Sequence, residues 1–372
     1  MITELKMKKY DIDELVNIKM LINNNNDSFG CEFHEDESSA SIVDNHYKCT
    51  CCGVDLTASQ YIAQTKGISR IEALAYLYRV NKQSIPDWLL EQVRPNIKLL
   101  KINSDLSKIC NEKLFDDTES SNNALKYLLE DRRLSLETIG KFSLGFFPKD
   151  KNFLNDLIIK YGKNELLELG IISEGEFGLY SMFANRVIFP ISNNMGQICG
   201  FGSRRLDGVK KNKYINSQQS RLFNKSELLY KERGVSKGVG IITEGYMDVI
   251  SCSQNEPKNS YYAALGVALS AKHVRDVLKK HEKVVICTDA DNAGIEATKK
   301  FIKESLRNID LNKVGFVLLP EKLDPDEFIN EYGREKFQDL INNSINAREF
   351  ISIVSNSYDE ISTLETYDKF RI

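Results

Sequence analysis

Two short pairs of residues near the N-terminus have the composition and spacing of a metal site. In each pair two residues separate the members, and fourteen residues separate the pairs: Cys31 and His34, then Cys49 and Cys52. Such pairs can place four ligands about 2.0 to 2.3 Å from one tetrahedral zinc ion. The spacing therefore predicts one structural zinc ion. Neighbouring Cys51 or His46 could replace a ligand of this set.

Six carboxylates follow three apolar runs that we expect to be strands, GVGIIT, KVVIC and KVGFVLLP. The acids come in pairs, one pair after each run: Glu244 and Asp248, Asp289 and Asp291, Asp324 and Asp326. In an open parallel sheet, ligands bind at the carboxyl ends of the strands, so the six acids can lie close together there. Mg²⁺ would relieve their repulsion and leave positions open for phosphate oxygens. The pattern predicts a metal site that acts on phosphates, although any single acid could instead cap a helix.

A basic segment precedes these acids. Between Arg186 and Lys237 eleven Lys or Arg residues stand against three acids, whereas the whole chain of 372 residues has 50 basic and 53 acidic side chains. A local excess of this sign suits a polyanion, although runs of charge are also common on solvated faces. The residues best suited to hold phosphates are Arg186, Arg204, Lys213, Asn216 and Lys225.

The length allows two or three domains, each able to bury a core. From residue 238 onward apolar runs alternate with helical patterns, which predicts a parallel sheet covered by helices. RVIFPIS and QICGFGS, separated by NNMG, predict a strand pair. We expect His273 and His281 on helix surfaces. No stretch of about 18 apolar residues and no signal peptide is evident, so we expect a cytoplasmic protein with no membrane partner.

In order along the chain, these segments resemble the bacterial DnaG-type primases. CEFH with CTCCG is similar to that family's zinc-ribbon motif, and YLLEDRRLSLETIGKFSLGFFP to the start of its polymerase domain. RVIFPI, GFGSRRL, KYINS and LFNKSELLY follow its basic motifs, and EGYMDVI, ALG, TDAD and DPDEFI follow its Toprim core, a metal-binding fold shared with topoisomerases. The resemblance implies a multi-domain α/β protein with an N-terminal zinc ribbon, a mixed α+β basic subdomain, a Toprim parallel-sheet core and a short helical tail.

We accordingly expect five segments: a zinc-binding ribbon domain at 1–83, a linker at 84–110, the basic subdomain at 111–235, the Toprim subdomain at 236–325 and the helical tail at 326–372. The resemblance implies a DNA primase that makes short RNA primers on single-stranded DNA during replication. Its substrates would be ribonucleoside triphosphates, its product an RNA–DNA hybrid and its chemistry Mg²⁺- or Mn²⁺-dependent nucleotidyl transfer.

The resemblance also assigns roles to residues. The six carboxylates would form the magnesium site, with Glu244, Asp289 and Asp291 as catalytic groups, and Glu244 could serve as ligand or as proton acceptor. The basic residues Arg186, Arg204, Lys213 and Lys225, together with Asn216, would hold the template backbone or the incoming triphosphate.

Departures from the family pattern leave the expected metal ligands in place. The family's CPFH reads CEFH, Cys51 stands where Gly is usual, and Val267 where Thr is usual. Only 46 residues follow Asp326, too few for the domain with which cellular members bind the replicative helicase, although a helicase is still a candidate partner. We therefore expect a phage or mobile-element primase or a C-terminally truncated form. The alternatives are a catalytically inactive regulator that binds single-stranded DNA and a Toprim nuclease.

Overall fold

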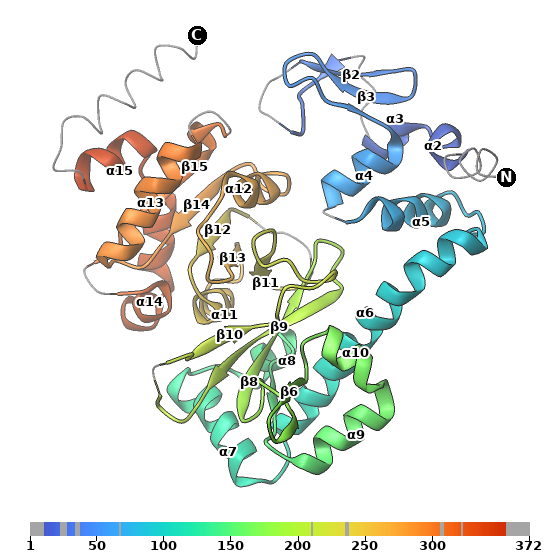
Figure 1. Ribbon diagram of the computed structural model, residues 1–372. Coiled ribbons are helices and arrows are strands. Elements are labelled where there is room, and N and C mark those ends of the chain that lie inside the picture. Colours follow the sequence, from blue (N-terminus) through green and yellow to red (C-terminus); the bar gives the residue numbers. More distant parts are fainter. Residues whose placement is uncertain are drawn as a thin grey trace. The chain divides into compact units, whose positions relative to one another are not determined.

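The computed structural model describes residues 11–22, 28–33, 38–66, 68–209, 211–234, 238–305, 309–320 and 323–354 (Figure 1). The chain divides into two compact units, Met1–Lys98 and Leu99–Ile372. Each unit has its own hydrophobic core, built from separate sets of buried side chains.

The first unit contains a four-stranded antiparallel sheet. Its strands are β1 (Ser28–Phe29), β2 (Ala40–Val43), β3 (His46–Cys49) and β4 (Asp55–Leu56). Its helices are α2 (Asp11–Leu15), α3 (Ile18–Ile22), α4 (Ala58–Lys66) and α5 (Arg70–Val80). Asp44 and Asn45 turn the chain between β2 and β3 with positive φ angles of 52° and 61°, which suits a two-residue hairpin. The Asn45 side chain also donates to the carbonyls of Asp13 and Val16, so the hairpin tip anchors the N-terminal helices.

Helix α6 (Asp87–Leu114) begins in the first unit and ends in the second. It includes Pro95 and covers most of the segment that we expect to be a linker. Its apolar residues at helical spacing, Leu99, Ile102, Leu106 and Cys110, are buried in the second unit. The domain boundaries read from the sequence stay a prediction.

The basic part of the second unit is built around an antiparallel sheet with the strand order β10–β9–β8–β5. These strands are β5 (Gly145–Phe147), β8 (Arg186–Ser192), β9 (Ile198–Arg205) and β10 (Tyr214–Asn216). The remaining elements are α7 (Glu119–Lys126), a π-helical turn η1 (Tyr127–Asp131), α8 (Leu136–Lys141), α9 (Lys151–Tyr161), α10 (Lys163–Glu168), β6 (Ser173–Gly175) and β7 (Gly178–Tyr180). The predicted pairing of RVIFPIS with QICGFGS is confirmed, since β8 and β9 run antiparallel.

The C-terminal part is a five-stranded sheet with the order β11–β13–β12–β14–β15 (Figure 1). Its strands are β11 (Leu229–Lys231), β12 (Gly240–Thr243), β13 (Ser260–Ala264), β14 (Val284–Cys287) and β15 (Val314–Val317). The last four are parallel, which confirms the predicted parallel sheet, whereas β11 adds an antiparallel edge strand. The helices are α11 (Tyr246–Asn255), α12 (Ala271–Leu278), α13 (Asn292–Ser305), α14 (Pro325–Asn342) and α15 (Ala347–Val354), and a short 3-10 turn η2 (Leu311–Lys313) precedes β15.

Both faces of this parallel sheet are buried, and alternate residues of each strand serve different cores. Ile241 and Val285 share a core with residues of α11 and α14. Ile242 and Ile286 share another with residues of α12, α13 and α15. Because both faces are covered, the strands are continuously apolar, and polar side chains are confined to the strand ends.

The expectation that His273 and His281 lie on helix surfaces is wrong. They are only 1% and 6% exposed. The His281 ring lies 2.9 Å from the Tyr262 hydroxyl through Nε2 and 2.8 Å from the Gly238 carbonyl oxygen through Nδ1. A neutral ring satisfies both partners, donating to the carbonyl and accepting from the hydroxyl. Burial lowers the pKa of both histidines.

We expect this burial to make the protein less stable in mild acid. Below a pH of about 6.5 the unfolded chain protonates its histidines, whereas folded His281 resists protonation because its pKa is lowered. Stability is therefore fully present above that pH and falls as the pH drops through it. Urea unfolding of the wild type and of His281→Gln at pH 7.5 and 5.5 would measure the effect. The variant should lose part of the pH dependence, and an unchanged dependence would place its origin elsewhere.

Candidate functional site

A cleft of about 710 Å³ lies in the second unit between the basic part and the carboxyl ends of the parallel strands. Seven of the residues singled out from the sequence line it: Lys213, Asn216, Lys225, Glu244, Asp248, Asp289 and Asp324. The structure thus brings cations and an amide from one subdomain opposite carboxylates from the other. Arg186, Arg204, Asp291 and Asp326 do not line the cleft.

The parallel sheet places the acids. Glu244 directly follows β12, Asp289 comes two residues after β14, and Asp324 is the N-cap of α14. The Asp289 amide donates to Glu244 Oε1 over 3.1 Å, which joins two strand ends. Asp324 Oδ1 accepts the Glu327 amide at 2.7 Å, and Asp291 Oδ1 accepts the Gly294 amide at 2.8 Å. These last two acids therefore also cap helices.

Burial and mutual repulsion raise the pKa of several acids at this edge. Burial is the main cause for Asp289, and the charges of Glu244 and Asp324 add to it, so that its pKa is raised to about 7. Asp248 is 5% exposed, and burial together with the Asp324 and Asp289 charges holds its pKa well above the usual value. Burial also raises the pKa of Glu244 and Asp324.

Asp289 Oδ1 is buried and accepts no hydrogen bond from the described part of the chain. An unpartnered buried carboxylate oxygen is costly unless a cation or a donor meets it. This oxygen and the clustered acids around it fit a divalent cation with oxygen ligands.

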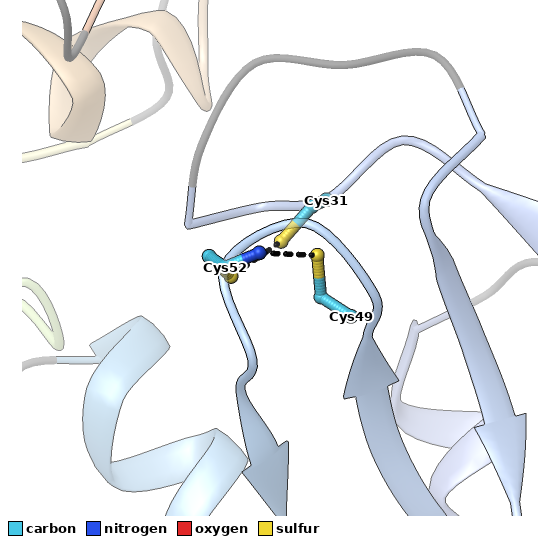
Figure 2. A group of neighbouring side chains, drawn as sticks. All are labelled: Cys31, Cys49 and Cys52. Atoms are coloured by element: carbon cyan, nitrogen blue, oxygen red, sulfur yellow. Dashed lines mark hydrogen bonds between the residues drawn. The ribbon is translucent and has the colours of Figure 1, made fainter.

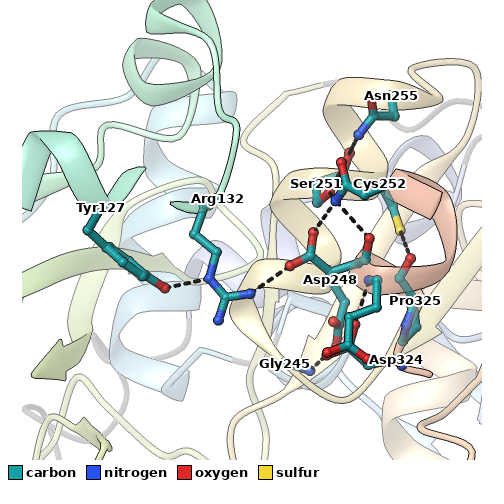
Figure 3. A network of polar contacts seen from close by, with 12 residues as sticks. Tyr127, Arg132, Gly245, Asp248, Ser251, Cys252, Asn255, Asp324 and Pro325 are labelled. Atoms are coloured by element: carbon teal, nitrogen blue, oxygen red, sulfur yellow. Dashed lines mark hydrogen bonds and ion pairs between the residues drawn. The ribbon is translucent and has the colours of Figure 1, made fainter. Parts of the chain in front are cut away.

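Asp326 has a different environment from the other five acids. Its Oδ2 accepts a hydrogen bond from Arg132 Nη1 at 2.8 Å, and its Oδ1 accepts one from Asn330 at 2.7 Å. Arg132 Nε in turn donates to the Tyr127 hydroxyl at 2.7 Å (Figure 3). Arg132 itself lines the cleft. We did not single it out from the sequence, where its only signal is its place in the motif YLLEDRRLS.

We expect Asp326→Ala to destabilise the second unit. Removing one member of a buried ion pair costs about 3–5 kcal/mol, and because the Arg132 side chain keeps 23% exposure we expect about 2–3 kcal/mol here. Urea unfolding of Asp326→Ala, Arg132→Met and the double variant would measure the coupling. Strictly additive losses would show that the pair contributes nothing of its own.

The two arginines that we predict to bind phosphate, Arg186 and Arg204, each contact other parts of the protein. Arg186 is 8% exposed and donates to the carbonyl oxygens of Asn212 and Lys213, so it shapes the loop that carries Lys213. The Arg204 guanidinium lies 4.1 Å from the ring centroid of Tyr127 and 5.7 Å from that of Tyr214. Its Nε and Nη1 atoms are buried and make no hydrogen bond within the described ranges.

Tyr246 and Asn216 connect the two sides of the cleft. The Tyr246 hydroxyl donates to Asn216 Oδ1 at 2.5 Å, and Asn216 Nδ2 donates to the Leu265 carbonyl at 2.8 Å. Gly202 on β9 lies against Tyr246, and a Cβ atom at Gly202 would come within 2.3 Å of that hydroxyl oxygen. Tyr246 stacks on Phe189 with ring centroids 4.9 Å apart. These contacts hold strand β10 of the antiparallel sheet against the parallel sheet.

In the first unit, Cys31, Cys49 and Cys52 come together (Figure 2). Their sulfur atoms all lie within 4.8 Å of one another, and the Cys31 and Cys52 sulfurs are 3.9 Å apart. Zinc–sulfur bonds of 2.3 Å in a tetrahedron imply a separation of about 3.8 Å. Burial opposes ionisation of the Cys49 thiol, but hydrogen bonds, chiefly from the Cys52 amide and the Ser39 hydroxyl, lower its pKa to about 6. The cluster therefore fits a zinc ribbon.

The fourth predicted ligand, His34, lies outside the described residues. Across the described ranges, the three cysteines are the one group of three or more metal-binding side chains whose ligand atoms are this close. Neither alternative ligand belongs to it: Cys51 is exposed, and His46 Nδ1 lies 2.5 Å from Asp55 Oδ1. Among the described residues, no three carboxylates of the cleft have oxygen atoms that all lie within 4.8 Å of one another.

Comparison with known families matches both parts of the second unit. Residues 110–235 match the N-terminal domain of the DNA primase catalytic core, and residues 241–329 match the Toprim-like domain. The fold and the cleft thus define a mixed α/β primase catalytic core that includes a Toprim domain.

Curated relatives carry the likeness along most of the chain. A DNA primase of Clostridium acetobutylicum is 33% identical over 365 residues, which cover 92% of this chain and 59% of the relative. A DNA primase of Buchnera aphidicola is 31% identical over 387 residues, which cover 100% of this chain and 66% of the relative. The chain belongs to the bacterial DnaG-type primases, as the sequence motifs predict. It spans about three-fifths of the length of the first of these relatives.

Solved structures give the same result. A DnaG primase catalytic domain bound to single-stranded DNA is 26% identical, with a TM-score of 0.64, over 74% of this chain and 92% of that one. The zinc-binding and RNA polymerase domains of the Aquifex aeolicus primase are 26% identical, with a TM-score of 0.60, over 97% of each chain. Among the described helices, none has both the length and the hydropathy needed to cross a membrane.

Proposed function

We propose that this protein is a DNA primase that synthesises short RNA primers from ribonucleoside triphosphates on single-stranded DNA. The observation that carries the proposal is the cleft itself, in which Lys213 and Lys225 stand opposite Glu244, Asp289 and Asp324. Ammonium groups bind phosphates as point charges, and carboxylates bind the divalent cations that accompany phosphates. The DnaG-type catalytic domain bound to single-stranded DNA supports the choice of template.

The carboxylates at the strand ends would hold Mg²⁺ or Mn²⁺, with Glu244, Asp248, Asp289 and Asp324 lining the cleft and Asp291 close in sequence to Asp289. When bound there, such ions activate the attacking hydroxyl and neutralise charge on the transferred phosphoryl group. The buried oxygen of Asp289 supplies an unpaired ligand atom. Glu244 is oriented by the amide of Asp289, which suits both ligation and proton acceptance.

Lys213 and Lys225 would bind the template backbone or the triphosphate, and Arg186 would act through the Lys213 loop that it shapes. Arg204 supplies two unpaired donors beside Tyr214, which lines the cleft. In the first unit, Cys31, Cys49 and Cys52 would hold a structural zinc ion, with His34 as the fourth ligand. The zinc ribbon would then engage the template, and the cleft would hold the growing RNA–DNA hybrid.

The test is primer synthesis by the full chain on single-stranded DNA, with labelled ribonucleoside triphosphates and Mg²⁺ or Mn²⁺. Short products that alkali degrades would support the proposal. Salt-sensitive DNA binding without any product would favour a regulator that binds single-stranded DNA, since binding to phosphates weakens as salt rises. Degradation of the template would favour a nuclease.

A further inference from the structure

A second, smaller cavity of about 70 Å³ lies in the catalytic core away from the cleft. It is lined by the turn between β8 and β9, by residues 231–234 at and after the end of β11, and by residues 259–262 at the start of β13. Lys280, which follows α12, completes the lining. The carboxyl end of β13 reaches the catalytic cleft, whereas its amino end lines this cavity. The two sites share no lining residue.

The cavity is basic. Its lining includes Lys231, Arg233 and Lys280 and a single acid, Glu232. The Glu232 carboxylate is already engaged, because Lys141 lies 2.9 Å from its Oε2 and the Ser253 hydroxyl donates to the same atom at 2.8 Å. The three cations of the lining therefore outweigh its one acid.

Lys231 has no acidic partner among the described residues. Its ammonium group donates to the neutral Asn194 Oδ1 at 3.0 Å, and no carboxylate in the described part of the chain forms an ion pair with it. Asp276 is close enough for its charge to favour the ammonium form, but this acid pairs with Lys272 and Lys279. Burial, and next the charge of Lys280, lower the pKa of Lys231 to about 8.

The Ser192 hydroxyl is a second polar group in the lining. Ser192 is 4% exposed, and its buried hydroxyl makes no hydrogen bond with any residue that the structure describes. Buried hydroxyl groups are nearly always paired, with protein, water or a ligand. An anion with several acceptor oxygens would satisfy this hydroxyl and the crowded ammonium groups of Lys231 and Lys280 together.

We propose that this cavity binds a phosphoryl dianion, either free phosphate or the terminal phosphoryl group of a small nucleotide. The cavity volume of about 70 Å³ is enough for roughly five water molecules. A cavity of this size can hold one phosphoryl group, and the rest of a nucleotide would lie outside it. Ser192 ends β8 and Asn194 lies in the turn that follows it, both in the antiparallel sheet part, whereas Lys231 ends β11 at the edge of the five-stranded sheet and Lys280 follows α12. The bound anion therefore bridges the two parts of the catalytic core. This site is independent of the proposed polymerase activity.

Isothermal titration calorimetry on the full chain tests the site. Inorganic phosphate and adenosine monophosphate would be titrated separately, without divalent cations and at constant ionic strength, into the wild type and four variants. Lys231→Met and Ser192→Ala alter the cavity. Lys279→Met is the matched control, because Lys279 is an exposed neighbour of Lys280 that does not line the cavity. Lys225→Met removes a cation from the cleft.

We expect Lys231→Met to weaken phosphate binding by about tenfold or more, the effect of losing one charged hydrogen bond, and Ser192→Ala to weaken it by a smaller factor. Lys279→Met should bind as the wild type does, and Lys225→Met should keep the binding event that Lys231→Met weakens. Equal affinities for the two probes would mean that the phosphoryl group alone is recognised, and tighter binding of the monophosphate would identify a nucleotide. Both results support the site.

Three results would overturn the proposal: no phosphate binding by the wild type, unchanged binding in both cavity variants, or loss of binding in Lys225→Met instead. Weaker binding of single-stranded DNA by Lys231→Met, with no phosphate binding by the wild type, would make the cavity part of a nucleic-acid surface. The circular dichroism and urea midpoint of each variant confirm folding, and Ser192→Ala keeps the test open if Lys231→Met does not fold.

Discussion

Asp289→Asn should lower ribonucleotide incorporation on single-stranded DNA by about 10²–10³-fold, because a metal ligand supplies several kcal/mol of transition-state stabilisation. The substitution keeps the shape of the side chain but removes its charge and replaces one carboxylate oxygen with an amide nitrogen. The buried Oδ1 of Asp289 lies at the cleft and has no hydrogen-bond partner among the described residues. Binding of single-stranded DNA should not weaken, since the substitution removes a negative charge from a site that faces phosphates.

The metal-free protein should become more stable above pH 7 in the same variant. Burial and the charge of Glu244 raise the pKa of Asp289 to about 7. Its charged form is thus unfavourable in the fold, and stability decreases as the pH rises from the ordinary carboxyl range towards that value. An asparagine at this position cannot ionise, so this decrease in stability does not occur in the variant.

Glu296→Gln is the matched control, because Glu296 is an exposed carboxylate on α13 that pairs with Lys299. Primer synthesis, DNA binding and urea unfolding would be measured on all three proteins. Full activity of Asp289→Asn would exclude this carboxylate as an essential ligand. Loss of activity together with loss of folding would leave the site assignment without support.

Cys49→Ser should abolish zinc binding in the first unit and reduce the start of new primers by at least about tenfold more than the extension of a supplied primer. The reason for the first effect is that Cys49 is 4% exposed and lies within 4.8 Å of both other thiolate ligands. The binding energy of a structural zinc ion is folding energy, so losing one ligand unfolds its surroundings. The second effect follows because the acids of the cleft belong to the other unit.

Zinc content, initiation on bare template and extension of an annealed primer would be measured side by side. Cys51→Ser serves as the control, since Cys51 is exposed and lies outside the cysteine cluster. Equal losses in both assays would argue against a separate role for the zinc ribbon in initiation. Zinc retained by Cys49→Ser would show that another residue completes the site.

The sequence predicts well those features that depend on local pattern. Alternating apolar runs and helical patterns predict the parallel sheet, and its topology then brings Glu244, Asp289 and Asp324 to one edge. The spacing of the cysteines predicts their cluster because short turns bring each pair together. In both cases each residue lies in or shortly after the strand or turn that places it, even where the grouped residues are far apart in the sequence.

Features that depend on long-range partners are not predictable in this way. A count of charges does not distinguish Arg186 from Lys213. In the structure, however, Arg186 donates hydrogen bonds to backbone carbonyl groups, whereas Lys213 lines the cleft. Asp326 matches the acidic pattern, but its partner Arg132 lies 194 residues away. The sequence places His281 in a helical pattern, where a polar side chain is expected at the surface. Only the fold shows that the Tyr262 hydroxyl and the Gly238 carbonyl satisfy its two ring nitrogens, which allows the side chain to be buried.

The contact between Gly202 and Tyr246 makes the width of the cleft depend on a residue with no side chain. A methyl group at position 202 would displace the Tyr246 ring, and with it the hydrogen bond that draws Asn216 towards the parallel sheet. The two halves of the cleft would then sit farther apart, with every acid and every lysine still present. Substitutions at this position offer a way to vary the distance between the lysines and the acids of the cleft without replacing any of them, and so to measure how activity depends on that distance.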